Sequence, residues 1–329
     1  MDFGLALDFG TNRATLDKVL DEYVPLLKLA EEHGFHSVVA GQSFPGRGGS
    51  FHVASPFLVL AALAPRTSLR LGTGVTLQPA WHPLNLAYDG AILDQLSGGR
   101  FFMGISVANP GDWDRFGMPR ETIGRRFDEL LQAMKALWSG ADGYEGELVK
   151  VKQAIHPLPI QPGGPPILVG GLSPRAARRA AAYADGYYAA TQYRLGAVGD
   201  QVGRYKTALR EAGKSADRPE VAINRLCCVA ETDEQAVNEG RPYVTKVLRA
   251  YASRGALAGE TADHLQLLER TMGDVCLVGS PDTVRRQMEA YAQAGVTRFE
   301  LRVAPGDMPA EMVARSIRLV GEHVIPSIQ

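Results

Sequence analysis

A glycine-rich turn carries the clearest chemical signal in the sequence. Gly170, Gly171, Leu172 and Ser173 follow an apolar run and precede Pro174. Glycines expose backbone N–H groups, and a serine followed by proline is typical of the start of a helix, whose N-terminal end attracts negative charge. The turn therefore predicts an anion cradle suited to a cofactor phosphate. The other interpretation is a strand-to-helix turn in which Ser173 only caps its own helix.

Two adjacent arginines are further candidates for holding a phosphate. Arg125 and Arg126 open a helical run upstream of this turn. A guanidinium at that place could reach a phosphate over the mouth of the fold, or it could stay solvated in the first turn of the helix. The residue types alone leave both roles open.

Polar and aromatic side chains follow most of the apolar runs that we expect to be strands. In a parallel barrel the active site lies where the strands end, and this rule selects those side chains. They include one carboxylate and many aromatic and amide groups, but no close pair of acids for glycoside hydrolysis and no metal-ligand spacing. A flat, partly apolar organic ligand fits such a lining better than a sugar or a metal ion. The candidate pocket residues are Asp8, Trp81, Asn109, Trp113 and Tyr193, with Gln42 and Ser106 beside them.

Eight short apolar runs alternate with amphipathic helical runs along the chain. Nearly continuous apolar stretches are typical of strands covered on both faces, and the alternation predicts parallel pairing through right-handed crossovers. Eight strands match a closed (β/α)8 TIM barrel better than a doubly wound open sheet, and no G-x-G-x-x-G follows the first run. The predicted strands are Phe3–Asp8, Ser37–Ala40, Leu69–Thr76, Phe101–Ser106, Ile167–Gly170, Gly186–Ala190, Val221–Ala230 and Thr297–Val303.

Two segments are longer than a crossover helix requires. We expect a single domain over residues 1–329 with insertions at about 139–166, after the fourth strand, and about 232–280, after the seventh. The first insertion contains a predicted hairpin, and the second contains extra helical material. Insertions of this size are typical of lids and pocket walls.

The composition argues against several classes of function. The 329 residues are 45% hydrophobic and carry 35 Lys and Arg against 36 Asp and Glu, a formal net charge of −1. Such a chain has an ordinary globular composition and no basic field, so we expect neither nucleic acid nor membrane as a partner. The first residues lack the pattern of a signal peptide and the three cysteines form no disulfide framework, so we expect a cytoplasmic protein.

A series of motifs occurs in a fixed order along the chain. Residues 71–75 read LGTGV, residues 82–83 read HP, residues 94–101 read DQLSGGRF and residues 279–282 read GSPD. In this order they resemble the bacterial luciferase-like flavin monooxygenases, also called LLM-class flavin-dependent oxidoreductases, over nearly the whole chain. The resemblance implies a barrel that binds reduced FMN, or the deazaflavin coenzyme F-420, at the carboxyl ends of its strands.

The resemblance also implies roles for individual residues. In the family a non-proline cis peptide at the end of the third strand supports the flavin ring, and the matching bond here joins Gly74 to Val75. The family's phosphate contacts match Arg125 and the turn at residues 170–173. Both features are expectations for the structure.

Departures from the family pattern concern catalysis. Gln42 stands where luciferase has a histidine after the second strand, and an amide cannot take up a proton at neutral pH. Ser106 and Val107 stand where luciferase has a cysteine and a phosphate-binding arginine, so we do not expect light emission. No catalytic base is assigned, and the candidates for a catalytic residue are Gln42, Ser106 and His52, which lies in the loop after the second strand.

Three functional hypotheses follow. The first is a two-component flavin monooxygenase that takes reduced FMN from a separate reductase and uses O2 to oxidise a small organic substrate. The second is an oxidoreductase that transfers hydride with the deazaflavin coenzyme F-420, and the third is a flavin-binding protein without catalysis. The resemblance also implies a homodimer.

Overall fold

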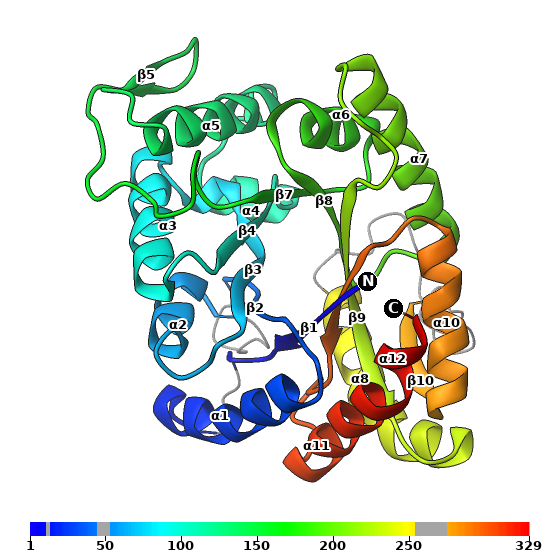
Figure 1. Ribbon diagram of the computed structural model, residues 1–329. Coiled ribbons are helices and arrows are strands. Elements are labelled where there is room, and N and C mark those ends of the chain that lie inside the picture. Colours follow the sequence, from blue (N-terminus) through cyan, green and yellow to red (C-terminus); the bar gives the residue numbers. More distant parts are fainter. Residues whose placement is uncertain (11–13, 45–52, 254–274, 329) are drawn as a thin grey trace.

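The fold is a closed barrel of eight parallel strands surrounded by helices (Figure 1), in a computed structural model that describes residues 1–10, 14–44, 53–253 and 275–328. Pairing of the last barrel strand with the first closes the cylinder, which confirms the predicted (β/α)8 fold. In barrel order the strands are β1 (Asp2–Leu7), β2 (Ser37–Ala40), β3 (Arg70–Leu77), β4 (Phe101–Ser106), β7 (Ile167–Gly170), β8 (Gly186–Ala189), β9 (Glu220–Val229) and β11 (Arg298–Arg302).

Most of the strand residues are buried because both faces of the barrel wall are covered. Every residue of β2, β7, β8 and β11 is buried, which is what helices on the outside and side chains on the inside require. All eight predicted strands are present, with ends within two residues of the expected ones.

A further strand, β10 (Cys276–Gly279), was not expected from the sequence. It pairs in parallel with the second half of β9, from Leu226 to Val229. Its four residues fall inside the segment 232–280, for which we expected extra helical material and named no strand. A run of four apolar residues is too short to show a hydrophobic periodicity, which would distinguish a strand from part of a helix.

Helices cover the outside of the barrel, and several have the ends that the sequence predicts. Pro83 opens α3, and Gly98 ends it in the left-handed conformation with φ of 66°. The helices are α1 (Leu16–Glu32), α2 (Pro56–Leu63), α3 (Pro83–Ser97), α4 (Pro110–Arg115), α5 (Ile123–Trp138), α6 (Pro174–Tyr183), α7 (Leu195–Glu211), α8 (Asp233–Ser253), α10 (Pro281–Gln293), α11 (Ala310–Leu319) and α12 (Ile325–Ile328), with short turns η1 (Gln78–Ala80) and η3 (Val320–Val324). Within the described ranges, no helix has the length and apolar character to cross a bilayer.

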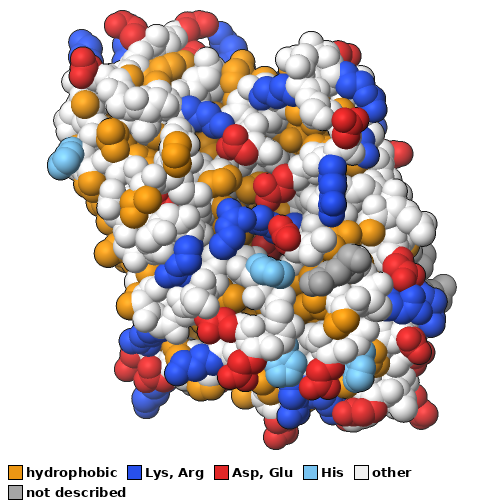
Figure 2. Space-filling view, in the orientation of Figure 1, with side chains coloured by type: hydrophobic (Ala, Val, Ile, Leu, Met, Phe, Trp, Pro, Cys, Tyr) orange, Lys and Arg blue, Asp and Glu red, His pale blue; other side chains and the backbone are white. Residues whose placement is uncertain are grey.

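The interior of the barrel is apolar at mid-height and charged at the end where the strands begin. The guanidinium groups of Arg70 and Arg298 lie 5.1 and 4.7 Å from the centroid of the Phe102 ring, and Arg298 pairs with Glu220 at 2.8 Å. Figure 1 places the N-terminus at the centre of the view, and Figure 2 shows basic and acidic side chains gathered at the centre of the same face. The apolar layer above these charges consists of Ala6, Val39, Phe102, Leu168, Tyr188 and Ala222.

The first predicted insertion contains the expected hairpin. Strands β5 (Tyr144–Glu145) and β6 (Lys150–Val151) pair antiparallel. The remainder of this segment is fastened to α3, because Asp94 accepts hydrogen bonds from the backbone N–H groups of Ile160 and Gln161 at 2.7 and 2.9 Å.

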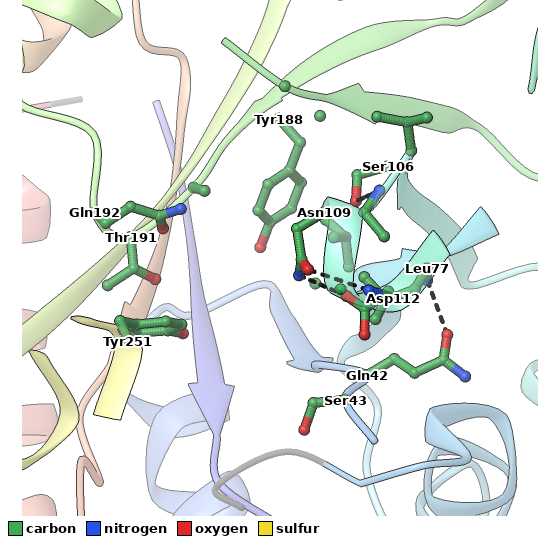
Figure 3. Close-up of a pocket in the computed structure, with 18 of the residues that line it drawn as sticks. Gln42, Ser43, Leu77, Ser106, Asn109, Asp112, Tyr188, Thr191, Gln192 and Tyr251 are labelled. Carbon is green, nitrogen blue, oxygen red and sulfur yellow. Dashed lines mark hydrogen bonds between the residues drawn. The ribbon is translucent and has the colours of Figure 1, made fainter. Parts of the chain in front are cut away.

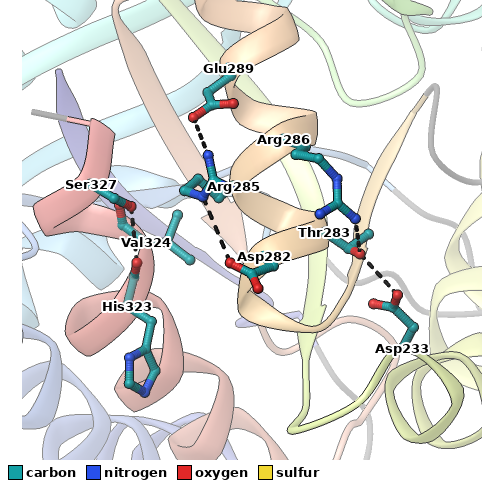
Figure 4. A network of polar contacts seen from close by, with 9 residues as sticks. All are labelled: Asp233, Asp282, Thr283, Arg285, Arg286, Glu289, His323, Val324 and Ser327. Carbon is teal, nitrogen blue, oxygen red and sulfur yellow. Dashed lines mark hydrogen bonds and ion pairs between the residues drawn. The ribbon is translucent and has the colours of Figure 1, made fainter.

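The second predicted insertion is fastened to the barrel at the start of α8 (Figure 4). Asp233 accepts hydrogen bonds from the backbone N–H of Ser280 at 2.7 Å and from the hydroxyl of Thr283 at 2.9 Å, and Arg286 donates to the same hydroxyl. Ser280 is the residue just before α10, and its own side chain makes no capping hydrogen bond. The helix start is satisfied instead by a carboxylate from α8.

Candidate functional site

A cavity of about 660 Å³ opens where the barrel strands end (Figure 3). Its volume lies in the range of about 300–1,000 Å³ that is usual for small-molecule sites. The end of β3 and the segments that follow β2, β4, β7 and β8 form its walls, together with Asn224 of β9 and Tyr251 of α8. The predicted site residues that line it are Gln42, Gly74, Val75, Ser106, Asn109, Trp113, Gly170, Gly171 and Tyr193.

The end of β3 forms the base of the cavity. The ladder between β3 and β4 is interrupted there, and the Gly74–Val75 peptide is cis, as the resemblance implied. A Cβ atom on Gly74 would lie 2.6 Å from the hydroxyl oxygen of Tyr188 and 2.9 Å from Cγ2 of Val39. Glycine is therefore the residue that allows β3 to approach the barrel interior this closely.

The side chain of Gln42 is held by three hydrogen bonds. Its Oε1 accepts from the backbone N–H of Leu77 at 2.8 Å and from Nε1 of Trp81 at 3.1 Å, while its Nε2 donates to the carbonyl of Ala54 at 2.7 Å. The amide thus ties the segment after β2 to the end of β3. This geometry suits a residue that positions the base of the cavity rather than one that moves a proton.

The wall that follows β4 is a short polar network. Asn109 caps α4 through the backbone N–H of Asp112 and donates from Nδ2 to the Asp112 carboxylate at 2.6 Å. Arg115 contacts the same carboxylate, and Trp113 donates from Nε1 to the carbonyl of Val107 at 2.6 Å. These contacts fix Asn109 and Trp113 along one side of the cavity.

Ser106, at the end of β4, keeps a hydrogen to donate. Its Oγ accepts from the backbone N–H of Ala108 at 3.3 Å. The hydroxyl faces the cavity in Figure 3, so its hydrogen is placed to reach a bound ligand.

The glycine-rich turn has the geometry of an anion cradle. Gln201 donates to the carbonyls of Gly171 and Ser173 at 3.2 and 2.9 Å, and Tyr187 donates to the carbonyl of Gly171 at 2.9 Å. The carbonyl groups are therefore occupied on the protein side of the turn. Among the described residues, the N–H groups of Leu172 and Ser173 make no hydrogen bond, so they remain for a ligand.

Ser173 also caps α6. Its Oγ accepts from the backbone N–H of Ala176 at 3.2 Å. A cap and a cradle are compatible, because the cap uses the side chain while the cradle uses the backbone.

Some predicted site residues lie away from the cavity. Trp81 packs edge-on against Phe57, with ring centroids 5.1 Å apart, and Arg125 pairs with Glu147 at 2.8 Å on the surface. Leu172 and Ser173 continue the turn on its exposed side and are not among the lining residues. His52 lies outside the described residues.

Asp8 lies behind the cavity, two contacts away from its lining. The buried carboxylate accepts from Nε of Arg302 at 2.7 Å, and Nη1 of Arg302 donates at 2.8 Å to the hydroxyl of Tyr251, which lines the cavity. Burial raises the pKa of Asp8 to about 6, although the Arg302 charge opposes this shift. Asp8 is thus a buried partner of Arg302 and is not in the lining itself.

A buried arginine that the sequence analysis did not single out shapes the segment after β8. Arg225 of β9 donates from Nη1 to the carbonyls of Ala190 and Thr191 at 3.0 and 3.1 Å, and from Nη2 to the carbonyl of Tyr193 at 2.5 Å. Its guanidinium carbon lies 4.6 Å from the Tyr291 ring centroid. The available signal was a charged residue inside an apolar strand, which is rare unless its charge is satisfied.

Comparisons with known proteins agree with this geometry. A sequence profile described as luciferase-like monooxygenase matches residues 1–298. The chain is 32% identical to the oxygenase component of the flavin-dependent trigonelline monooxygenase of Acinetobacter baylyi, over 96% of this chain and 92% of that protein. It is 26% identical to the 5,10-methylenetetrahydromethanopterin reductase of Archaeoglobus fulgidus, over 94% of this chain and 96% of that protein.

Solved structures show the same fold. The monooxygenase RslO1 from Streptomyces bottropensis superposes with a TM-score of 0.86 at 30% identity, covering all of both chains. The oxygenating constituent of 3,6-diketocamphane monooxygenase from Pseudomonas putida, solved with FMN, superposes with a TM-score of 0.80 at 22% identity, covering 100% of this chain and 99% of that one. On the profile match and the extent of these similarities, the chain belongs to the luciferase-like monooxygenase family, whose members are flavin-dependent enzymes.

Proposed function

We propose that the protein is the oxygenase component of a two-component flavin monooxygenase, which takes reduced FMN from a separate reductase and uses O2 to oxidise a small organic substrate. The observation that carries this proposal is the cavity itself, whose lining combines the bulged end of β3 with Gly170 and Gly171, the first two residues of the glycine-rich turn. Its volume and its mixture of aromatic and amide side chains suit a flat ring with a phosphate tail. The 32% identity to a flavin-dependent oxygenase component supports the same choice.

The residues present fit reduced FMN. Backbone N–H groups of Leu172 and Ser173, at the start of α6, would hold the phosphate, and the Gly74–Val75 segment would support the ring. The bound flavin would supply the oxygen chemistry. The chain itself positions the ring, excludes water and offers hydrogen-bond donors such as Ser106.

Arg125 keeps a place in the proposal as a surface residue that could turn to the phosphate. Its ion pair with Glu147 joins two side chains that are 56% and 70% exposed, and such pairs contribute about 0–1 kcal/mol. The pair is therefore weak enough to exchange for a phosphate contact. The proposal does not depend on this movement, because the glycine-rich turn already borders the cavity through Gly170 and Gly171.

The second candidate is hydride transfer with the deazaflavin coenzyme F-420. The similarity to a methylenetetrahydromethanopterin reductase favours it. The amide of Gln42 weighs against it, because many deazaflavin-dependent members of the family carry an Asp-His pair where this chain has Gly41 and Gln42, and an amide does not take up a proton at neutral pH. The named relatives are enzymes, which argues against a flavin-binding protein without catalysis.

An anaerobic titration separates the two candidates. Trp113 lines the cavity, so tryptophan fluorescence should report binding of reduced FMN and of reduced deazaflavin in parallel experiments. Preferential binding of FMN at micromolar level, followed by substrate-dependent O2 consumption, is the expected result. Preferential binding of the deazaflavin would move the protein to hydride transfer, and binding of neither would overturn the flavin assignment.

We further propose a homodimer that works in the cytoplasm. Large apolar side chains are exposed at the end of α3, where Leu96 is 58% exposed and Ile160, whose backbone N–H donates to Asp94, is 50% exposed. Leu58 of α2, a helix that contacts α3, is 72% exposed. Exposed large apolar side chains are common at interfaces. The three cysteines are buried and free, as in a reducing compartment. Light scattering of the purified protein should give twice the mass of 35.5 kDa.

A further inference from the structure

Arg115 is the one basic residue among the described residues that line the cavity, and the proposed flavin contacts do not use it. It is the last residue of α4, and its side chain is 47% exposed. The other lining residues are neutral except for Asp112. A guanidinium on the wall of a small-molecule site suits an anionic group of the ligand, because its N–H groups are charged donors.

The ion pair between Arg115 and Asp112 leaves the guanidinium, not the carboxylate, open to a ligand. Nη1 of Arg115 donates to Oδ1 of Asp112, and Nδ2 of Asn109 donates to Oδ2 at 2.6 Å (Figure 3). Both oxygens of Asp112 are therefore engaged, and its side chain is only 9% exposed. Among the described residues, Arg115 makes no hydrogen bond through Nε or Nη2. A ligand in the cavity thus meets unused donors of Arg115 rather than the acceptors of Asp112.

The fold places Arg115 on a different side of the cavity from the glycine-rich turn. Phe116, the next residue, packs edge-on against Phe44, with ring centroids 4.9 Å apart, and Phe44 lines the cavity in the segment after β2. The glycine-rich turn follows β7, and the strand order β2-β3-β4-β7 separates the two segments. An anionic group at Arg115 is therefore not the flavin phosphate held at the turn but belongs to a second molecule, the substrate.

The surroundings of Arg115 favour an aromatic carboxylate. Phe44 and Trp113 also line the cavity, and a flat apolar ring packs well against aromatic side chains. Nε and Nη2 lie on one edge of the guanidinium, and this edge matches the two oxygens of a carboxylate through a pair of parallel hydrogen bonds. The helix that carries Arg115 is held in place, since Trp113 donates from Nε1 to the carbonyl of Val107 at 2.6 Å.

We infer that Arg115 binds the carboxylate of the substrate, and that the substrate is a small aromatic carboxylate. The inference rests on the proposed function for the reaction that this substrate undergoes, whereas the contact with Arg115 can be measured without turnover. Arg115 thereby determines specificity, because it distinguishes an anionic ligand from a neutral one of the same shape.

The test compares benzoate with benzamide, which has a similar shape and no charge. Titration calorimetry of the protein, without flavin and loaded with FMN, measures both dissociation constants. The wild type should bind benzoate more tightly than benzamide, and added salt should weaken only the binding of benzoate. Arg115→Gln should weaken benzoate about 10-fold, the equivalent of about 1.4 kcal/mol, and should leave benzamide and FMN unchanged. Arg115→Lys should fall between the two proteins, because it keeps the charge and loses the paired donors.

Two further variants separate a contact with Arg115 from a change in charge. Arg120→Gln is the matched control, because Arg120 pairs with Asp114 at 2.8 Å and does not line the cavity, so its variant should bind benzoate like the wild type. Arg115→Gln/Asp112→Asn removes both charges of the cavity pair and should keep the loss for benzoate. Recovery of wild-type affinity in this double variant would mean that the bared Asp112 carboxylate repels benzoate, and would overturn the inference.

The inference and the proposed function fail on different results. If the wild type binds FMN but does not prefer benzoate at millimolar concentration, or if Arg115→Gln binds benzoate unchanged, the role of Arg115 is wrong and the proposed function stands. If the wild type binds neither flavin yet prefers benzoate through Arg115, the flavin assignment is wrong and the carboxylate site stands. A loss in Arg115→Gln that affects FMN, but not benzoate or the phosphate-free riboflavin, would assign Arg115 to the flavin phosphate and contradict the inference.

Discussion

Three hydrogen bonds converge on the amide of Gln42, and they join two segments that would otherwise be separate walls of the cavity. Replacing Gln42 with alanine should lower the free energy of unfolding by about 1–3 kcal/mol, because the N–H groups of Leu77 and Trp81 lose their acceptor. Urea unfolding of both proteins measures this. Gln153→Ala, at an exposed glutamine, should stay within about 0.5 kcal/mol of the wild type. A Gln42→Ala protein of unchanged stability that had lost turnover would instead place Gln42 in the chemistry.

Gly74 and Tyr188 form a second residue-scale unit, because the space between them is too small for a methyl group. Gly74→Ala should destabilise the protein by about 1–3 kcal/mol through overpacking. Part of this loss should be recovered in Gly74→Ala/Tyr188→Phe, since the oxygen 2.6 Å from the new Cβ is then gone, while Val39 at 2.9 Å remains. The double-mutant cycle measures the recovery. Strictly additive effects would mean that the new methyl group is accommodated elsewhere.

At the scale of elements, the turn between β7 and α6 is pinned from beneath by Gln201 of α7. Gln201→Leu should free the carbonyls of Gly171 and Ser173 and so loosen the N–H groups on the other side of the turn. Affinity for FMN should fall about 2- to 13-fold, because the loosened turn should weaken phosphate binding by about the energy of one hydrogen bond. Affinity for riboflavin, which lacks the phosphate, should stay unchanged. Fluorescence titration with both flavins checks this. An equal loss for both flavins would place the effect at the ring rather than at the phosphate.

The sequence predicts the end of a helix where a single residue determines it. Gly98 ends α3 because its left-handed φ suits glycine, and Ser173 caps α6 as its place just before Pro174 predicts. Ser280 precedes a proline in the same way, yet Asp233 takes its place as the partner of α10. Local sequence patterns do not predict this contact, because it joins residues 47 positions apart.

The same limit applies to the site. The glycine-rich turn was predicted because glycine marks it locally, and the bulge at Gly74 was implied by the family resemblance. The contacts of Arg225 and Asp8 and the close approach of Tyr188 to Gly74 were not predicted, since each depends on a residue far along the chain. When a strand is identified only as an apolar run, the polar side chains that it directs into the barrel are overlooked.

At the scale of the whole molecule, the barrel contains a carboxylate in its interior. Glu300 is fully buried, and Ser37 donates its hydroxyl to both carboxylate oxygens at 3.1 and 3.2 Å. Burial raises the pKa of Glu300 to about 7, and the nearby Glu220 adds to the shift, while Arg298, the Ser37 hydrogen bond and Arg70 oppose it. The folded protein therefore holds this proton more tightly than the unfolded chain does, whose ordinary glutamate pKa is 4.5.

This difference gives the stability of the molecule a pH dependence with a definite sign. The protonated carboxyl stabilises the fold fully below pH 4.5, and that contribution is lost as the pH rises through about 7. Glu300→Gln stays neutral at every pH, so the unfolding free energy of the variant minus that of the wild type should become more positive from pH 5 to pH 8. Asp8 shifts in the same direction but is present in both proteins, so its effect cancels. Urea unfolding at several pH values measures this difference, and Glu211→Gln, at an exposed position, is the control. A difference in unfolding free energy that does not change with pH would mean that the barrel interior compensates the Glu300 charge completely.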